Sequence, residues 1–453
     1  MKNIVAGRRV HVAAGSESLI SSSGLSLLAQ TASVSGLADA LSDGLLSWRK
    51  PTAVHDPGKV VLDLLLAIAA GGDCLADVSL VRAQPELFGP VASDPTISRL
   101  IDVLGADPSA VLAAVRAARA SARAKVWAHR SPFTDDATAV VVDLDATLIG
   151  AHSEKELASP NYKRGFGFHP MMAFVDHGTG GTGEPLAAML RTGTANANNA
   201  DDQIRVLNDA LAQLPADARS RVLVRGDGGS GVKAFVHHIA GLGLQYSVGM
   251  NARQPVLDAL ADLPRQAWKK ALDTNGERRE GALVAELTRW LPDAFTGWPP
   301  GMRVIARKER PHPGAQLRIT DENGWRITIF ATNTTGPTLA ELEVRHRSRA
   351  RCEDRIRNLK DTGATNLPLH AFGKNQIWLE LSQLASELIV WTQLLAFHDL
   401  PARVWEPKRL RLRILAVAGR IITTARRRIL RLSRRWPWTN LILTGHRRLA
   451  EIT

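Results

Sequence analysis

The sequence has 453 residues, enough for about three domains, and its apolar content of 45% is ordinary for a globular protein. Its two cysteines, Cys74 and Cys352, exclude a disulfide framework and a cysteine-based zinc site. The apolar runs at 60–70 and 388–397 are too short to span a bilayer, and residues 1–19 lack the continuous apolar core of a signal peptide. We therefore expect a cytoplasmic protein that has no membrane segment.

The net charge of +13 is concentrated at the C-terminus. Residues 401–453 hold 14 Lys and Arg against 2 Glu, whereas residues 1–400 hold 43 basic and 42 acidic residues. A basic segment of this kind suits a polyanion. Tryptophans alternate with arginines there and no long apolar face is present, which favours nucleic acid over a membrane surface. The alternative is a basic tail that is simply solvated.

The N-terminal part, residues 1–135, is expected to form a helical DNA-binding domain. Residues 1–50 are rich in Ser, Gly and Ala and predict an irregular lead-in. Apolar residues then recur at helical spacing over 60–68. An Ala- and Arg-rich helix is expected over 109–127.

A shorter helix of this domain is expected to begin at Asp94, which would act as its N-cap because proline follows it. Two short helices around Pro90 are compatible with a helix-turn-helix, and equally with a plain helical bundle.

A strand at 140–149, with the sequence VVVDLDATLI, carries two acids. Side chains alternate along a strand, so Asp143 and Asp145 point to the same side. Two carboxylates on an apolar strand are costly unless a cation lies between them or one is protonated. The pair therefore indicates divalent-metal or covalent carboxylate chemistry, although Asp145 could instead end the strand and cap a turn.

The following elements complete the first part of an α/β core, which we place at 136–250. Two further strands are expected in antiparallel order around the turn GTGGTG, which is not a phosphate loop because no Lys-Ser/Thr follows it and a strand comes next. A helix at 201–214 precedes a strand at 221–227 that ends in Asp227, and a glycine-rich run then opens another helix before a strand at 246–249.

Residues 251–335 change character and are expected to form a β-rich insertion with four tryptophans. The core resumes at 336–400 with a long helix that begins near residue 338 and an amphipathic helix at 376–397. A basic helical tail over 401–453 closes the chain.

Glu353 lies on the first of these two helices, with Arg349 four residues before it and Lys360 seven after. At about 100° per residue these offsets keep the three side chains within one helical stripe. A solvated ion-pair stripe is the alternative interpretation, because such pairs are common on helices.

The order Asp145, Asp227, Glu353, with an insertion before the Glu, resembles the DDE transposases of bacterial insertion sequences. The spacing of Arg349, Glu353 and Lys360 is similar to the Tyr-Arg-Glu-Lys signature of one large group, in which His346 here replaces the Tyr. The motifs DLDAT, NYKRGFGFHP, RGDGGSG, HDPGKVVLDL and QPELFGPVASDPT resemble the insertion sequence thirteen-eighty family more closely. The resemblance covers roughly residues 50–440.

This resemblance implies a ribonuclease H-like catalytic core in which Asp145, Asp227 and Glu353 are catalytic and bind two Mg²⁺ or Mn²⁺ ions. It implies an endonuclease and strand transferase that performs cut-and-paste transposition at insertion-sequence ends. The expected partner is double-stranded DNA, bound by a homodimer or larger synaptic assembly, and the expected location is the cytoplasm at the nucleoid. Carboxylates suit Mg²⁺, which prefers oxygen ligands, and two such ions can promote phosphoryl displacement.

The residues expected to contact DNA come from three places. Arg349 and Lys360 flank the catalytic Glu, and Arg426, Arg427 and Arg428 form a basic run in the tail. Trp298 lies in TGWPPG, where glycine and prolines predict an exposed loop, and by resemblance it would stack on an unpaired base. Core packing is an equally good interpretation of any one tryptophan here, and Trp325 is expected to be packed.

A phosphatase is the main competing interpretation. The strand VVVDLDATLI also resembles the first motif of haloacid-dehalogenase-type phosphatases, with Asp143 as the nucleophile and Asp145 as the general acid/base. That family needs a further acid four or five residues after Asp227, but Gly231 and Val232 stand there. A phosphatase also leaves the basic tail without a function.

A third possibility is a DNA-binding protein without catalysis, such as the remnant of an inactive element. Intact acids at all three expected positions argue against it.

Overall fold

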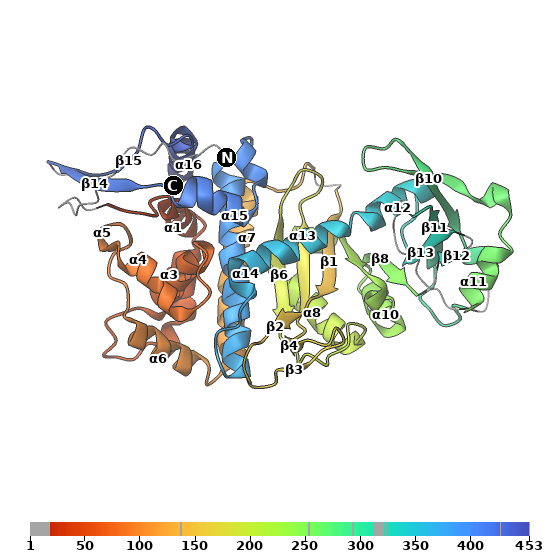
Figure 1. Ribbon diagram of the computed structural model, residues 1–453, viewed down its shortest axis with the longest axis horizontal. Helices are drawn as coiled ribbons and strands as arrows, with labels where there is room; N and C mark the ends of the chain where they lie inside the picture. The colour runs from red at the N-terminus through yellow and green to blue at the C-terminus, as the bar shows by residue number, and fades with distance from the viewer. Residues whose placement is uncertain are drawn as a thin grey trace, which may run out of the picture.

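The computed structural model describes residues 19–135, 138–251, 254–291, 294–311, 321–322, 324–425 and 427–452. The protein is a mixed α/β structure with one large mixed sheet, in agreement with the predicted class. Two long helices, α7 (Pro108–His129) and α14 (Phe372–Ala396), run side by side between a group of N-terminal helices and the sheet (Figure 1). The chain thus places its helical part and its sheet on opposite sides of this helix pair.

The N-terminal helices begin much earlier than the sequence predicts. Their bounds are α1 (Leu25–Val34), α2 (Leu37–Gly44), α3 (Pro57–Ala69), α4 (Ser79–Arg82), α5 (Pro85–Phe88) and α6 (Asp94–Leu104). The expected irregular lead-in over 1–50 is therefore wrong from residue 25 onward, while residues 1–18 lie outside the described residues. Leu25, Leu28 and Leu41 are fully buried. Tertiary packing therefore stabilises helices in a segment whose Ser- and Gly-rich composition gives only a weak helix signal.

Two smaller expectations about this part also change. Ser93, not Asp94, is the N-cap of α6, and Asp94 takes the first helical position. The helices that flank Pro90 are α5, with 4 residues, and α6, with 11. A helix of a single turn offers little surface for a helix-turn-helix, so the structure favours the plain bundle.

The predicted strands of the core are present and form five neighbours in the sheet, in the order β6-β5-β1-β7-β8. Their bounds are β1 (Val140–Ala146), β5 (Met171–Asp176), β6 (Gly183–Met189), β7 (Val222–Gly226) and β8 (Gln245–Met250). β1, β5 and β6 are antiparallel, as predicted, whereas β7 pairs parallel to β1 and β8 parallel to β7. The segment between β1 and β5 also contains a small sheet, made of β2 (Ile149–Gly150), β3 (Ser159–Pro160) and β4 (Phe166–Phe168).

The β-rich insertion extends this sheet instead of forming a sheet of its own. Its elements are α11 (Gln254–Ala261), β9 (Lys269–Leu272), β10 (Arg278–Glu286), β11 (Arg303–Glu309), β12 (Asp321–Glu322) and β13 (Trp325–Thr332). β13 pairs antiparallel with β8, and β11, β10 and β9 follow in that order. β13 thereby satisfies the open hydrogen-bonding edge that β8 would otherwise present to solvent.

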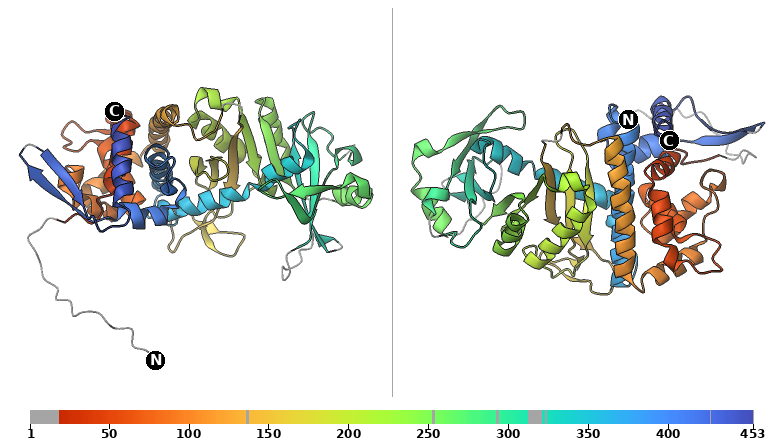
Figure 2. Two further views of the ribbon diagram at one scale, coloured as in Figure 1. Left: turned by 90° about the horizontal axis from the view of Figure 1, so that it is seen from above. Right: turned by 180° about the vertical axis from the view of Figure 1, so that it is seen from behind.

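Helices cover both faces of the core strands. α8 (Ala200–Gln213) and α10 (Lys233–Gly241) lie behind the sheet, and α13 (Ala350–Leu359) crosses its front (Figures 1 and 2). The short α9 (Ala216–Arg219) follows α8, and α12 (Leu339–Arg347) packs on β9, β10 and β11 of the insertion. The single long helix expected from residue 338 is thus two helices, because the chain turns at Ser348 and Arg349. The capping box of Thr338 and Glu341 confirms the predicted start of the first.

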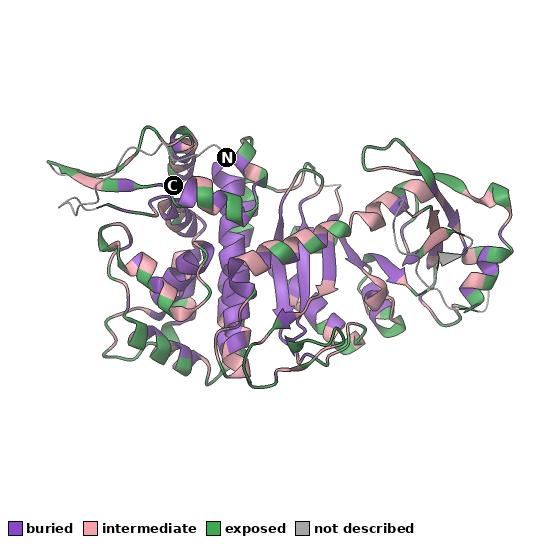
Figure 3. Ribbon diagram, in the orientation of Figure 1, coloured by how far each residue is buried: buried purple, intermediate pink, exposed green. Residues whose placement is uncertain are grey.

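Helix α14 differs from its expected amphipathic character because it is buried on every side from Ile377 to Ala396 (Figure 3). None of the described helices is long and apolar enough to cross a membrane. The two buried glutamates of α14, Glu380 and Glu387, are instead neutralised by arginines of α7.

The basic C-terminal segment is only partly helical, which corrects the expectation of a helical tail. It contains α15 (Pro407–Leu410), the hairpin β14 (Gly419–Thr424) and β15 (Arg427–Leu432), and α16 (Thr439–Ala450). Helix α16 packs on α1 and α14 through buried Ile442 and Leu449. The hairpin projects from the body and is largely exposed (Figures 2 and 3).

Candidate active site

Asp145 lies near the carboxyl end of β1, where the strand leaves the core. Its side chain is 16% exposed, its Oδ1 accepts the backbone N–H of Ala146 at 2.8 Å, and its Oδ2 lies 3.5 Å from Nη1 of Arg349. Burial raises the pKa of Asp145 to about 6, and the negative charges of Asp227 and Glu353 add to this, against the opposing charge of Arg349. The structure therefore brings Asp145 within electrostatic reach of both other acids.

Asp227 follows β7, the parallel neighbour of β1, so both acids emerge at the same edge of the sheet. Its Oδ1 accepts the N–H of Gly229 at 2.9 Å and so caps the short turn Gly228–Ser230. The glycines around it allow a close approach of two chain segments: a Cβ on Gly249 would lie 2.7 Å from the backbone N of Gly228, and one on Gly231 would lie 2.3 Å from the carbonyl O of Gly249. The glycine-rich run is thus required to hold Asp227 against the end of β8.

Glu353 occupies the first turn of α13 and is exposed. Within the described part of the chain it makes no hydrogen bond or ion pair. Arg349 occupies the N-cap position of this helix and its side chain approaches Asp145, and Lys360 follows the helix and donates to the carbonyl O of Leu148 at 2.8 Å. The side of α13 that carries Arg349, Glu353 and Lys360 therefore faces the end of β1.

Asp143 lies two residues before Asp145 but has a different environment. It is 1% exposed, and Arg225 donates to both of its oxygens, at 2.6 Å and 2.7 Å. A carboxylate held by a bidentate, buried arginine is not free to act as a nucleophile. This geometry argues against the phosphatase alternative, which requires an available Asp143.

The sequence reasoning missed the ion-pair cluster around Asp143. Arg225 also donates to Oδ2 of Asp176 at 2.9 Å and to the carbonyl O of Arg345 at 2.8 Å, and Arg351 donates to the same Asp176 oxygen at 2.6 Å. The cluster connects β1, β5 and β7 to α12 and α13. A signal was present, because Arg225 and Asp176 are charged residues in otherwise apolar strands.

His346, at the position of the signature tyrosine, has a packing role. Its ring stacks on Phe330 with centroids 4.4 Å apart and planes 6° apart, and its Nδ1 lies 3.0 Å from Oγ of Ser247. Burial and nearby arginines lower its pKa to about 3, so the ring is neutral. An aromatic contact is thus retained in spite of the substitution.

The other residues expected to contact DNA lie outside this edge or beside it. Trp298 is half-buried, packs edge-on against Phe295 with centroids 5.7 Å apart, and lines a cavity with Gly231 and Met250. Its loop is held to α10, since the ring of His237 lies 2.8 Å from the carbonyl O of Gly297. Trp298 is therefore less exposed than predicted, but it lies next to the loop that carries Asp227.

The remaining tail and insertion residues have mixed positions. Arg427 and Arg428 are exposed at the start of β15, and Arg426 lies outside the described residues. Trp325, which was expected to be packed, opens β13 and is half-buried, with Lys308 and Arg310 over its ring at 5.4 Å and 5.3 Å.

The three acids suit a hard divalent cation by the chemistry of their ligand atoms. All offer carboxylate oxygens, and a raised pKa at Asp145 indicates negative charge that the protein itself does not neutralise. Among the described residues, the group whose possible ligand atoms all lie within 4.8 Å of one another is a different one, made of Asp73, Cys74 and Asp77. There, Oδ2 of Asp77 already accepts the backbone N–H groups of Asp73 and Cys74, so this group is a helix cap.

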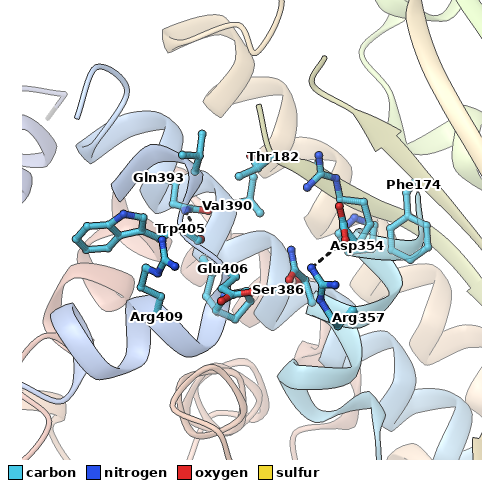
Figure 4. A pocket seen from close by; sticks show the side chains of 17 residues that line it. Phe174, Thr182, Asp354, Arg357, Ser386, Val390, Gln393, Trp405, Glu406 and Arg409 are labelled. Carbon is cyan, nitrogen blue, oxygen red and sulfur yellow. Dashed lines mark hydrogen bonds and ion pairs between the residues drawn. The ribbon is translucent and has the colours of Figure 1, made fainter. Parts of the chain in front are cut away.

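A cavity of about 280 Å³ lies on a different face of α13 (Figure 4). It is bounded by Asp354 and Arg357, which form an ion pair at 2.9 Å, by Ser386 and Gln393 of α14, and by Trp405. Glu353 and Asp145 do not line it. The cavity is therefore separate from the acidic edge.

Almost the whole chain is similar to a known protein family. It matches the family described as Transposase DDE domain group 1 over residues 2–453. No curated protein matches it. Among solved structures, a cryo-EM structure of the piggyBac transposase synaptic complex with hairpin DNA matches with a TM-score of 0.40 and 9% identity, over 87% of this chain and 80% of that one. From the family match, the chain belongs to the DDE transposases.

Proposed function

We propose that this transposase cleaves DNA at the ends of an insertion sequence and transfers the strands, with Asp145, Asp227 and Glu353 as its catalytic acids. The observation that carries the assignment is that Asp145 and Asp227 lie at the same edge of the sheet, on or just after the parallel neighbours β1 and β7, where Asp145 is also within electrostatic reach of Glu353. The pairing of both Asp143 oxygens with Arg225 favours Asp145 over Asp143 for this role. The strand order β6-β5-β1-β7-β8, antiparallel and then parallel, supports a ribonuclease H-like core.

The proposed cofactor is Mg²⁺ or Mn²⁺, bound as two ions. When bound, the ions supply Lewis-acid stabilisation of the attacking and leaving oxygens of the phosphodiester. The chain's own contribution is to position the carboxylates: β1 and β7 hold Asp145 and Asp227 at one edge of the sheet, and Glu353 of α13 lies within electrostatic reach of Asp145. Arg349, 3.5 Å from Asp145, offsets part of their repulsion while the metals are absent.

The proposed reaction is a phosphoryl displacement, first by water and then by a DNA 3′-hydroxyl. We propose that Arg349 and Lys360, which border the acids, contact DNA phosphates at the cut. Trp298 borders the Asp227 loop, and we propose that it stacks on a base that leaves the duplex. A cut-and-paste route through a homodimer or larger complex, on double-stranded DNA at the nucleoid, is part of the same proposal.

The test replaces each acid with its isosteric amide: Asp145→Asn, Asp227→Asn and Glu353→Gln. Metal-ion stabilisation supplies several kcal/mol, so each change is expected to reduce Mg²⁺-dependent cleavage by about a thousandfold or more. Duplexes taken from the two borders of the DNA that surrounds the coding sequence serve as substrates. Binding of these duplexes in EDTA should persist, because the acids would ligate metal and not read bases.

Asp354→Asn is the matched control, because this acid is the next residue on α13 and is paired with Arg357 on another face. It should retain cleavage. An Asp145→Asn protein that cleaves nearly as well as the unaltered chain would reject the assignment and return attention to Asp143.

A further inference from the structure

The C-terminal hairpin β14–β15 has the composition of a surface that binds a polyanion. No acidic residue occurs between Glu406 and Glu451, and this stretch contains 13 Lys and Arg. In the hairpin and just beyond it, the exposed cations of the described chain are Arg420, Arg427, Arg428, Arg431, Arg434 and Arg435.

Other basic residues of the tail differ from these cations because they have partners in the body of the protein. Arg413 lies between Trp405 and Trp438, 4.8 Å and 4.7 Å from their ring centroids. Lys408 pairs with Asp361 at 2.8 Å, and Arg448 donates to Asp399 at 2.7 Å. The tryptophans that favoured nucleic acid in the sequence are therefore structural, and the charge left for a partner lies in the hairpin.

The strand register places the charge mainly on one face of the hairpin. Arg420 is opposite Arg431, Ile422 opposite Ile429, and Thr424 opposite Arg427, and these six side chains share a face. Within the described residues, Arg427 and Arg431 make no side-chain hydrogen bond or ion pair, and Ile429 is 43% exposed.

The base of the hairpin is fixed while its tip projects. Gly419 exchanges two backbone hydrogen bonds with Ile20, at 2.8 Å and 2.9 Å, and a Cβ on Gly419 would lie 2.5 Å from Oγ of Ser23. Leu432 packs on the core at the other end of the base. An anchored two-stranded ribbon, about 20 Å long for six residues per strand, extends from the body (Figure 2).

We infer that the hairpin β14–β15 enters the major groove of double-stranded DNA with the face that carries Arg427, Ile429 and Arg431. The major groove is about 12 Å wide and admits a two-stranded ribbon, and arginine is well suited to the acceptors that it displays. The inference rests on the proposed function, since it assigns part of that function's DNA binding to one element.

The experiment measures binding of the full chain to a duplex of about three helical turns and shuffled sequence, in EDTA, by fluorescence anisotropy at several salt concentrations. Arg427→Ala/Arg431→Ala is expected to weaken binding by about tenfold or more, from the loss of two arginine contacts. Replacing residues 420–431 with a short Gly-Ser turn should weaken it further and flatten the dependence of log K on log salt. Methyl green, which occupies the major groove, should compete with the unaltered chain, and netropsin, which occupies the minor groove, should not.

Arg205→Ala, an exposed arginine of α8, is the matched control for loss of surface charge alone, and it should change affinity by less than about threefold. Thermal melting confirms that each variant is folded. Unchanged affinity and salt slope in a folded chain without the hairpin would overturn the inference, as would competition by netropsin alone. Such a result, with Asp145→Asn still inactive in cleavage, would leave the proposed transposase function in place.

Discussion

Two acidic regions of this protein are built in opposite ways. In the core, Arg119 and Arg123 of α7 lie between Glu380 and Glu387 of α14 and Glu184 of β6, and all five side chains are at most 1% exposed. At the edge of the sheet, Asp145, Asp227 and Glu353 share a single nearby arginine among the described residues, and it lies 3.5 Å from Asp145.

The difference separates an acid that holds the fold together from one that is available for chemistry. Burial alone would disfavour ionised Glu184, but hydrogen bonds from His177 and Trp127 and the charge of Arg123 outweigh it and hold its pKa low. At Asp145, burial and two like charges prevail, and the pKa is raised to about 6. Acidic groups that no cation neutralises lower the stability of the folded protein. Such groups are typical of functional sites, where the loss of stability is tolerated because the charge is used.

The largest effect on stability is expected from breaking the core network. Arg123→Met would leave Glu184 and Glu387 without one of their cations in a dry interior, which costs about 3–5 kcal/mol of unfolding free energy. Urea or thermal unfolding measures the loss. The control is Arg357→Met, which removes a cation that is 61% exposed and should have little effect. A loss below about 1 kcal/mol for Arg123→Met would show that the network is not a structural element.

At the acidic edge of the sheet, a substitution is expected to raise the free energy of unfolding instead of lowering it. Asp145→Asn should stabilise the metal-free protein at about pH 8 by about 3 kcal/mol, since a rise from the ordinary pKa of 3.8 to about 6 is a penalty on the ionised form. The folded state binds its proton more tightly, so this penalty is absent below about pH 3.8 and complete above about pH 6. Melting in EDTA at about pH 4 and about pH 8 tests the sign, and Asp354→Asn should show no such gain.

Metal binding should reverse that gain. Mg²⁺ at about 100 times its dissociation constant would stabilise the unaltered protein by about 2.7 kcal/mol, and it should not stabilise Asp145→Asn. The stabilisation should fall as the pH decreases through about 6, because protons then compete for Asp145. Equal stabilisation of both proteins by Mg²⁺ would place the ions elsewhere.

The smallest effect is expected at Trp298, which lies beside the loop that carries Asp227. Trp298→Ala should slow cleavage by about tenfold, because base stacking is worth about 1–3 kcal/mol, and leave initial binding unchanged. A substrate with an abasic position beside the cut should partly restore the rate, since no base then has to leave the stack. If the variant melts several degrees lower and each folded molecule cleaves normally, Trp298 is a packing residue against Phe295.

The sequence by itself determined the elements whose patterns are local. The valine-rich strand with two acids, the strand that leads directly into Asp227 and the helix start near residue 338 are all present, because alternation and caps act over a few residues. The order of the acids was also sufficient to identify the family. The roles of the three acids remain predictions.

Tertiary structure decided which charges are free. Asp143 and Asp145 are indistinguishable by alternation, but the pairing of β1 with β7 puts Arg225 beside Asp143 alone. The arginines of α7 look like a solvated stripe until Glu380 and Glu387, more than 250 positions away, come to lie against them. In the basic tail, likewise, only the folded structure shows which cations pack against the body and which are exposed on the hairpin. Ion pairing depends on partners distant in the chain, which local sequence patterns do not specify.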